Sequence, residues 1–294
     1  MIMVRMKYVT SKYNGVQVLK DVNLAVEEGD FLVLFGADDE GKTTLLHILM
    51  GFNTSYSGKV ALMESRPNNL NVEQRSQVRF VPDSLILEPG MTGADYLQYA
   101  KDAAGAYDEA LQWALCEENA VSLEKELEYM TAQENKLVQV IGAVCAGPRL
   151  LILDEPSNFL GRQAYALLLK HLGQWNRKGM TVLLAAEQYE AAGGFCSRYA
   201  YLKGGRIIVD SSAPSGEQRG KIITVAGGKG EVLKKYLPNC ISRYDGKTVH
   251  YYKGDMQRLA LILYYAACED WAVEELTLRE ELDGDFSRWD VYGQ

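Results

Sequence analysis

The chain has 294 residues, of which 47% are hydrophobic and 24% are charged, and its formal net charge is −8 at pH 7. These values exclude a chain that is disordered throughout, because it has enough apolar side chains to form a core. The acidic balance argues against a protein that coats nucleic acid. At about 150 residues per domain, the length predicts two domains.

The cysteines and the apolar runs exclude other classes. The five cysteines are scattered, with no CxxC pair, so we expect reduced thiols in a cytosol and no structural zinc site. The longest apolar run has ten residues, 259–268, whereas a membrane span needs about 20. The first ten residues, MIMVRMKYVT, include no apolar stretch of signal-peptide length. We therefore expect a soluble chain that is not exported.

The first half of the chain predicts strands followed by helices. Residues 1–35 are expected to form strands, ending in the continuous apolar run 31–35, which is typical of a buried strand. A glycine-bounded loop at 36–44 precedes a short helix that stops at Gly51. Further strands are predicted at 59–63 and 78–81. The composition then favours helices over 92–137, where Trp113 and Cys116 are expected to pack in the core.

The second half returns to strands. Apolar runs predict buried strands at 150–153 and 181–185, and Lys203-Gly204-Gly205 predicts a hairpin between 199–202 and 206–209. Strands that alternate with helices predict an α/β fold with a largely parallel sheet. We place a first domain at 1–212, with a helical subdomain at about 85–140, and a linker near 211–220. A small α+β domain at 220–294 is expected to hold the following elements: strand 222–226, helix 230–236, strand pair 241–252, helix 255–268 and strand 272–278.

A phosphate-binding pattern occupies the loop after the strand at 31–35. Gly36, four residues, and then Gly41-Lys42-Thr43 match this pattern, and Thr44 continues into the helix. Backbone N–H groups at a helix N-terminus point at phosphates. Lys42 would reach the β- and γ-phosphates, and the Thr43 hydroxyl would bind Mg²⁺. The alternative is a glycine-rich turn with a surface lysine.

Three acidic residues lie inside this loop. Asp38, Asp39 and Glu40 would repel a bound polyanion if they faced it. We expect either that they point outward or that they weaken nucleotide binding.

A second acidic motif follows the strand at 150–153. Asp154, at the end of this strand, suits the coordination shell of Mg²⁺, and Glu155 suits the base that orients an attacking water. Taken alone, an apolar run followed by two acids is common at strand ends. Together with the loop at Gly36, it predicts a nucleotide site for ATP and Mg²⁺.

At this point residues 3–212 resemble the ATP-binding cassette (ABC) family, the ATPase subunits of ABC transporters. GADDEGKTTLL is similar to GPNGAGKTTLL, and LLILDEPSNFL is similar to LLLLDEPTNGLD. The resemblance implies a P-loop NTPase-type nucleotide-binding domain with an inserted helical subdomain. It places Tyr13, in KYNGVQVLKDVNLAVEEGD, where the family stacks an aromatic ring on adenine. The tail VEELTLREEL is weakly similar to the end of the appendage in an importer-like and drug- or peptide-export subgroup.

The chain departs from the family at the motif that serves the partner's nucleotide. The LSGGQ signature aligns with Met130-Thr131-Ala132-Gln133-Glu134. Thr131 keeps a hydroxyl and Ala132 adds little bulk. Gln133 replaces a glycine, and Glu134 adds a negative charge where phosphate should approach. We expect this half of the site to function weakly or not at all.

Three further family positions also differ. Glu187 stands at the switch histidine, and an ionised carboxylate cannot donate a hydrogen bond to the γ-phosphate. Asp83 stands at the glutamine that senses Mg²⁺ and the permease, and Gly161 stands at an aspartate of the dimer interface. Two interpretations stay open: family drift with hydrolysis retained, or a subunit that binds nucleotide and hydrolyses it slowly or not at all.

The resemblance also implies partners. The chain has one phosphate loop, so it implies a second cassette, either a copy or a different subunit, and a separate membrane permease that docks near Asp83 and the helical subdomain. The chain would lie in the cytoplasm, on the inner face of the membrane. The alternatives are a non-hydrolysing regulatory or structural subunit, and a ribosome-associated ABC protein, for which the chain is too short and too acidic.

Overall fold

The computed structural model describes residues 1–13, 15–187 and 196–210, and the backbone of four later strands at 221–226, 241–244, 247–252 and 275–280. The chain divides into two compact units, 1–198 with 202–206, and 199–201 with 207–294. Each unit is described by itself. The predicted linker at 211–220 lies outside the described residues.

The first unit is built on four parallel strands in the order β5-β6-β7-β3. The sheet order continues with β8 and β9, each of which has residues in both units. Every residue of β3, β6 and β7 is buried, which explains their continuous apolar sequences. The predicted parallel α/β core is therefore confirmed. The strands are β3 Phe31–Phe35, β5 Val78–Val81, β6 Leu150–Asp154, β7 Thr181–Ala186, β8 Arg198–Lys203 and β9 Arg206–Asp210.

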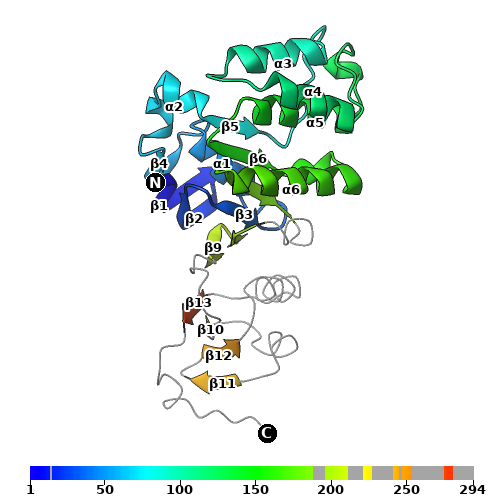
Figure 1. Cartoon of the computed structure of the whole chain (residues 1–294). Helices are drawn as coiled ribbons and strands as arrows, with labels where there is room; N and C mark the ends of the chain where they lie inside the picture. The colour runs from blue at the N-terminus through cyan, green and yellow to red at the C-terminus, as the bar shows by residue number, and fades with distance from the viewer. Residues whose placement is uncertain are drawn as a thin grey trace. The chain divides into compact units, whose positions relative to one another are not determined.

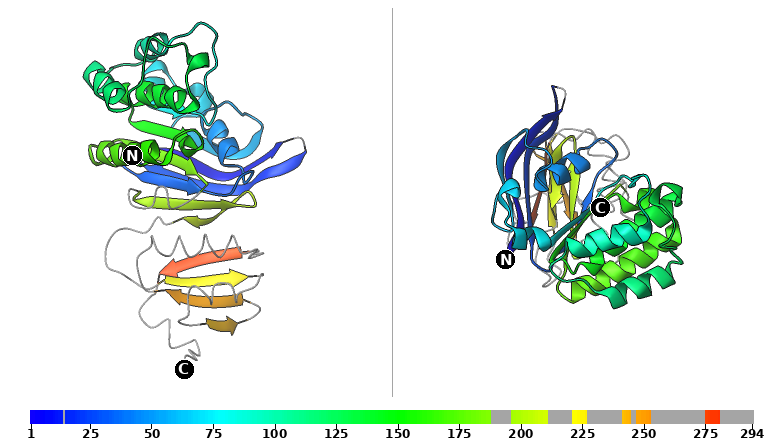
Figure 2. Two further views of the ribbon diagram at one scale, coloured as in Figure 1. Left: turned by 90° about the vertical axis from the view of Figure 1, so that its right-hand side faces the viewer. Right: turned by 90° about the horizontal axis from the view of Figure 1, so that it is seen from above.

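A separate antiparallel sheet precedes this core. Its order is β2-β1-β4, formed by β1 Ile2–Tyr13, β2 Val16–Glu27 and β4 Tyr56–Leu62. The two long blue strands β1 and β2 run side by side in Figure 2. The strands predicted for the first 35 residues are thus present, in two different sheets.

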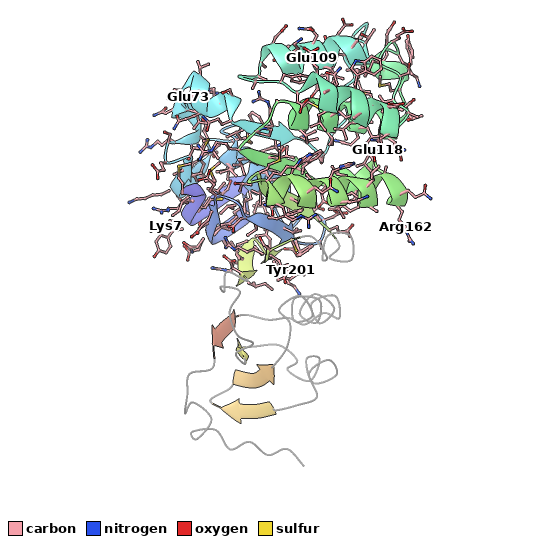
Figure 3. All side chains as sticks on the ribbon, viewed as in Figure 1. Lys7, Glu73, Glu109, Glu118, Arg162 and Tyr201 are labelled. Carbon is pink, nitrogen blue, oxygen red and sulfur yellow. The ribbon has the colours of Figure 1, made fainter. Side chains whose placement is uncertain are left out.

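Three of the helices lie at or near residues 85–140, where a helical subdomain is predicted. In Figure 1, α3, α4 and α5 gather together, while α6 lies beside β6. Glu118 of α4, labelled in Figure 3, contacts α6 through His171, with 2.8 Å between Oε2 and Nε2. The helices are α1 Lys42–Leu49, α2 Val72–Ser76, α3 Gly93–Asp102, α4 Glu109–Glu118, α5 Ala132–Cys145 and α6 Arg162–Arg177, with 3₁₀ turns at Pro67–Asn69, Leu127–Tyr129 and Pro156–Asn158.

One packing expectation in this subdomain is wrong. Cys116 is buried as predicted, but Trp113 is 75% exposed. Leu115 and Cys116 face the interior, and a residue two positions before Leu115 lies on the opposite side of a helix.

None of the described helices is long and apolar enough to cross a membrane.

The second unit contains an antiparallel sheet of order β11-β12-β10-β13. The strand predicted at 222–226 and the strand pair at 241–252 are confirmed. The last predicted strand, 272–278, is present from Glu275, and residues 272–274 lie outside the described residues. The predicted helices at 230–236 and 255–268 lie outside the described residues. The strands are β10 Lys221–Ala226, β11 Ile241–Tyr244, β12 Lys247–Tyr252 and β13 Glu275–Glu280.

Candidate nucleotide-binding site

The phosphate-type loop joins the end of β3 to the start of α1. A Cβ on Gly36 would lie 2.7 Å from the backbone oxygen of Leu202, and Gly41 has a φ of +101°. Both positions therefore require glycine. The N-terminus of α1 has no side-chain cap and no acid in its first turn. Its free N–H groups and its dipole are available for an anion.

Lys42 lies at the centre of the site with its ammonium group buried. Nζ donates hydrogen bonds to the backbone oxygens of Gly36 at 2.6 Å and Ala37 at 2.8 Å. It also forms an ion pair with Oε1 of Glu155 at 2.9 Å, in which both side chains are at least 90% buried. Lys42 therefore has two hydrogen-bond acceptors and one anionic partner around its ammonium group.

The three acids of the loop have different surroundings. Asp38 and Asp39 are exposed, and Asp39 adopts a φ of 63°, a left-handed conformation that Asp tolerates. Glu40 is half-buried, and its Oε2 accepts a hydrogen bond from the backbone N–H of Gly204, in the turn between β8 and β9. Of the three acids, Glu40 is therefore the one whose side chain is hydrogen-bonded to a distant part of the chain.

Asp154 ends β6 as a fully buried carboxylate. Its pKa is raised to about 6, chiefly by burial; Thr43 and Lys42 act against this rise, and the charges of Asp83 and Glu155 add to it. No hydrogen bond of standard geometry reaches either carboxylate oxygen, although Thr43 is close enough to affect the pKa. A buried carboxylate beside a hydroxyl fits Mg²⁺, which prefers oxygen ligands. The described residues contain no cluster of three acidic, His or Cys side chains for a metal, so phosphate and water would complete the shell.

Glu155 adopts an unusual backbone conformation at the next position. Its φ of 44° and ψ of 48° are left-handed, which is uncommon for a residue other than glycine and occurs often at functional sites. Its Oε2 accepts a hydrogen bond from the backbone N–H of Glu187 at 3.1 Å. The structure therefore brings Glu187 to Glu155 through its backbone.

Most of the predicted site residues meet in one place. Lys42, Thr43, Asp154 and Glu155 form its centre, and the half-buried Asp83 influences Asp154 electrostatically. Thr44 is half-buried in the first turn of α1. Tyr13 ends β1 with 70% of its surface exposed, so its ring is accessible for stacking.

The signature-like segment forms a capped helix start. Thr131 Oγ1 accepts from the N–H of Glu134 at 3.2 Å, and Glu134 Oε2 accepts from the N–H of Thr131 at 2.7 Å. Lys125 adds a hydrogen bond of 3.0 Å to the same oxygen. The backbone N–H of Thr131 and then Lys125 lower the pKa of Glu134. These contacts form a capping box at the N-terminus of α5.

The two middle residues of this segment are exposed. Ala132 has only a small side chain. Gln133 Oε1 accepts a hydrogen bond of 3.0 Å from the backbone N–H of Gly161. The position that aligns with a family glycine is therefore occupied by a side chain that bonds within the same chain.

The sequence reasoning missed a buried polar face on α5. Asn135, Lys136 and Gln139 are each at most 1% exposed. The signal that could have revealed them is the spacing of Asn135 and Gln139, which lie four residues apart, one before and one inside the otherwise apolar stretch 137–145.

Part of the chain is similar to known ABC transporter proteins. Residues 19–158 match the family described as ABC transporter. The spermidine/putrescine import ATP-binding protein PotA of Vibrio cholerae is 25% identical over 271 residues, which cover 89% of this chain and 70% of that protein. The maltose/maltodextrin import ATP-binding protein MalK of Salmonella typhimurium is 27% identical over 210 residues, covering 69% of this chain and 57% of that protein.

Solved structures support the fold. The ATP-binding subunit of an ABC transporter aligns with a TM-score of 0.65 at 23% identity, covering 71% of this chain and 89% of that one. A dimeric ATP-binding cassette in a post-hydrolysis state, bound to ADP and Pi, aligns with a TM-score of 0.64 at 21% identity, covering 73% and 100%.

Proposed function

We propose that this chain, which carries an ABC-type ATPase cassette, is the ATP-binding subunit of a multi-subunit ABC transporter and uses MgATP to drive a separate membrane permease. The observation that carries the proposal is the buried Lys42–Glu155 ion pair, at 2.9 Å, beside the uncapped N-terminus of α1. This arrangement combines a phosphate-binding helix end with a carboxylate suited to orient water.

Each residue of the site would have a separate role in nucleotide binding. Lys42 would exchange its contact with Glu155 for phosphate oxygens, which frees Glu155 to accept a hydrogen bond from water. Thr43, Asp154 and, through its nearby charge, Asp83 would hold Mg²⁺, which neutralises phosphate charge when it is bound. Tyr13 would stack on adenine. Glu187 would position Glu155 through its N–H.

The partners follow from the composite site of the family. A second cassette, identical or different, would present its signature segment to this site, while Thr131–Gln133 would face the partner's nucleotide. The permease would hold the subunit at the inner face of the membrane. The names of the two curated relatives contain the word import, which favours import as the direction. The domain bounds 1–212 and 220–294 stay a prediction.

Calorimetric titration of MgATP into the purified chain tests nucleotide binding. We expect Lys42→Ala to weaken binding at least about 100-fold, because the phosphate charge loses its buried cation. Lys59→Ala is the matched control, since Lys59 is an exposed lysine on β4. Equal binding by wild type and Lys42→Ala would contradict the proposal.

A second candidate is a non-hydrolysing subunit paired with a competent cassette. The observations that favour it are the carboxylates of Glu134, at the signature-like helix start, and Glu187, at the switch position. Turnover of the assembled complex separates the candidates. If Glu155→Gln abolishes turnover, this chain hydrolyses ATP; if turnover stays at the wild-type level, the chain acts as a nucleotide-binding regulator.

A further inference from the structure

The buried polar face of α5 is unusual for a helix in a core. Asn135, Lys136 and Gln139 are 1%, 0% and 1% exposed. Buried amide and ammonium groups destabilise a fold unless each finds hydrogen-bond partners. The hydrogen-bond partners of these three side chains therefore show which part of the chain the polar face contacts.

All three side chains bond to one short segment, the loop at residues 82–86 that follows β5. We call the three side chains the α5 clamp. Their hydrogen bonds to the loop are Lys136 Nζ to Pro82 O at 2.6 Å and to Ser84 O at 2.9 Å, Gln139 Nε2 to Ser84 O at 3.3 Å, Asn135 Nδ2 to Ile86 O at 2.6 Å, and Ile86 N to Asn135 Oδ1 at 3.1 Å.

The clamp holds the loop on both sides of Asp83. The two carbonyl groups that Lys136 binds belong to the residues immediately before and after Asp83. The Lys136 ammonium is also close enough to Asp83 and Asp154 for both to raise its pKa, although burial lowers that pKa to about 8. It lies 5.0 Å from the centre of the Phe159 ring, in the segment after Glu155. One ammonium thus joins α5, the loop and the acidic end of β6.

We propose that the α5 clamp orients Asp83 toward Asp154 and makes the loop 82–86 move with α5, with Lys136 as its main positioning residue. A loop bonded so often to one helix follows that helix when it shifts. A displacement at the N-terminus of α5 would then reach the magnesium carboxylates through Lys136. The magnesium part of this inference rests on the proposed function, whereas the loop part does not.

Hydrogen exchange of the nucleotide-free full chain tests the clamp directly. Lys136→Met keeps the aliphatic stem and removes every donor, whereas Lys136→Gln keeps an N–H donor and also removes the charge. We expect the amides of residues 83–86 to exchange at least about tenfold faster in Lys136→Met and within about threefold of wild type in Lys136→Gln. Lys170→Met, the same change on the exposed side of α6, is the control.

The magnesium dependence of ATP binding tests the effect on Asp83. The readout is the ratio of the ATP dissociation constants measured with EDTA and with Mg²⁺. Both variants lack the positive charge, so a difference between them reports the hydrogen bonds alone. We expect this ratio to be about tenfold smaller in Lys136→Met than in Lys136→Gln.

The outcomes separate the two proposals. Equal exchange or equal magnesium ratios in the two variants would overturn the positioning role. If Lys136→Met does not fold, Gln139→Leu removes the 3.3 Å bond to Ser84 O and a 2.9 Å bond to Asn135 Oδ1 but leaves Lys136 in place. It should accelerate exchange of Ser84 without global unfolding; unchanged exchange there would overturn the clamp. If wild type binds no ATP, the proposed function fails, and the exchange result alone decides whether the clamp exists.

Discussion

The N-termini of α1 and α5 offer opposite surroundings to a phosphate group. Helix α1 follows Gly41 with no side-chain cap and no acid in its first turn. Helix α5 follows Thr131, and Glu134 closes a capping box over its first turn. The first helix keeps free N–H donors for a ligand, while the second satisfies its donors within the chain and adds a negative charge. Under the proposed function, this difference would make the chain better equipped to bind its own nucleotide than to serve that of a partner.

Giving α1 the chemistry of α5 should have the largest effect. Thr44 occupies the third position of α1, as Glu134 does in α5. We expect Thr44→Glu to weaken MgATP binding by about 100-fold or more, because a carboxylate would compete with phosphate for the helix end. Thr44→Gln, of similar size and no charge, should lose less than about tenfold. Calorimetry that shows equal losses would attribute the effect to size instead.

The second prediction concerns Asp154, whose buried carboxylate should lower the free energy of unfolding when it is ionised. The pKa of Asp154 is about 6 in the fold, above the reference value of 3.8, so ionisation destabilises the protein as the pH rises from about 4 through 6. We expect Asp154→Asn to increase stability at pH 7.5 by about 1–3 kcal/mol and to abolish the magnesium dependence of ATP binding. The gain should disappear at pH 4.

Urea denaturation at these two pH values measures the change. Asp38→Asn, at an exposed acid of the same loop, should leave stability unaffected at both. A gain for Asp154→Asn that is equally large at pH 4 would contradict the assignment of the cost to ionisation.

Removing the charge at α5 should produce a moderate gain of function. Glu134→Gln can keep the capping box, because an amide oxygen also accepts the N–H bond, while it removes the negative charge. We expect the variant to dimerise about three- to tenfold more tightly with MgATP. Sedimentation velocity measures this, with Glu124→Gln as the exposed control. Unchanged dimerisation would indicate that Gln133, rather than Glu134, limits this surface.

The smallest effect is expected at Asp39. This exposed residue has a φ of 63°, which glycine adopts without strain. Asp39→Gly should strengthen MgATP binding by about two- to fivefold, because a negative charge and a strained backbone are both removed. Asp38→Gly is the control, because Asp38 is also exposed but does not have a positive φ. It should strengthen MgATP binding less than Asp39→Gly in the same titration.

The sequence predicted the buried strands and the loop between β3 and α1 because local patterns encode them. Continuous apolar runs identified β3, β6 and β7, since strands buried on both faces need no polar alternation. The spacing of Gly36, Gly41 and Lys42 predicted a tight loop before a helix, and the structure has this loop between β3 and α1. These elements required no knowledge of distant contacts.

The features that the sequence did not predict depend on partners far away in the chain. Lys136 resembles any helical lysine until its two carbonyl partners, more than fifty positions earlier, are known. Trp113 seemed apolar enough for the core, but the direction of α4 turns it outward. Orientation and long-range pairing, rather than residue type, determined these outcomes.

The hydrogen bond between Glu40 and the backbone of Gly204 has a consequence for the order of events during synthesis. The two residues are 164 positions apart, and Gly36 packs closely against Leu202 of the same hairpin. A nascent chain contains the loop at 36–44 well before the ribosome delivers this hairpin. The loop can therefore gain these two contacts only after residues 202–204 have been translated, when most of the first unit has already been made.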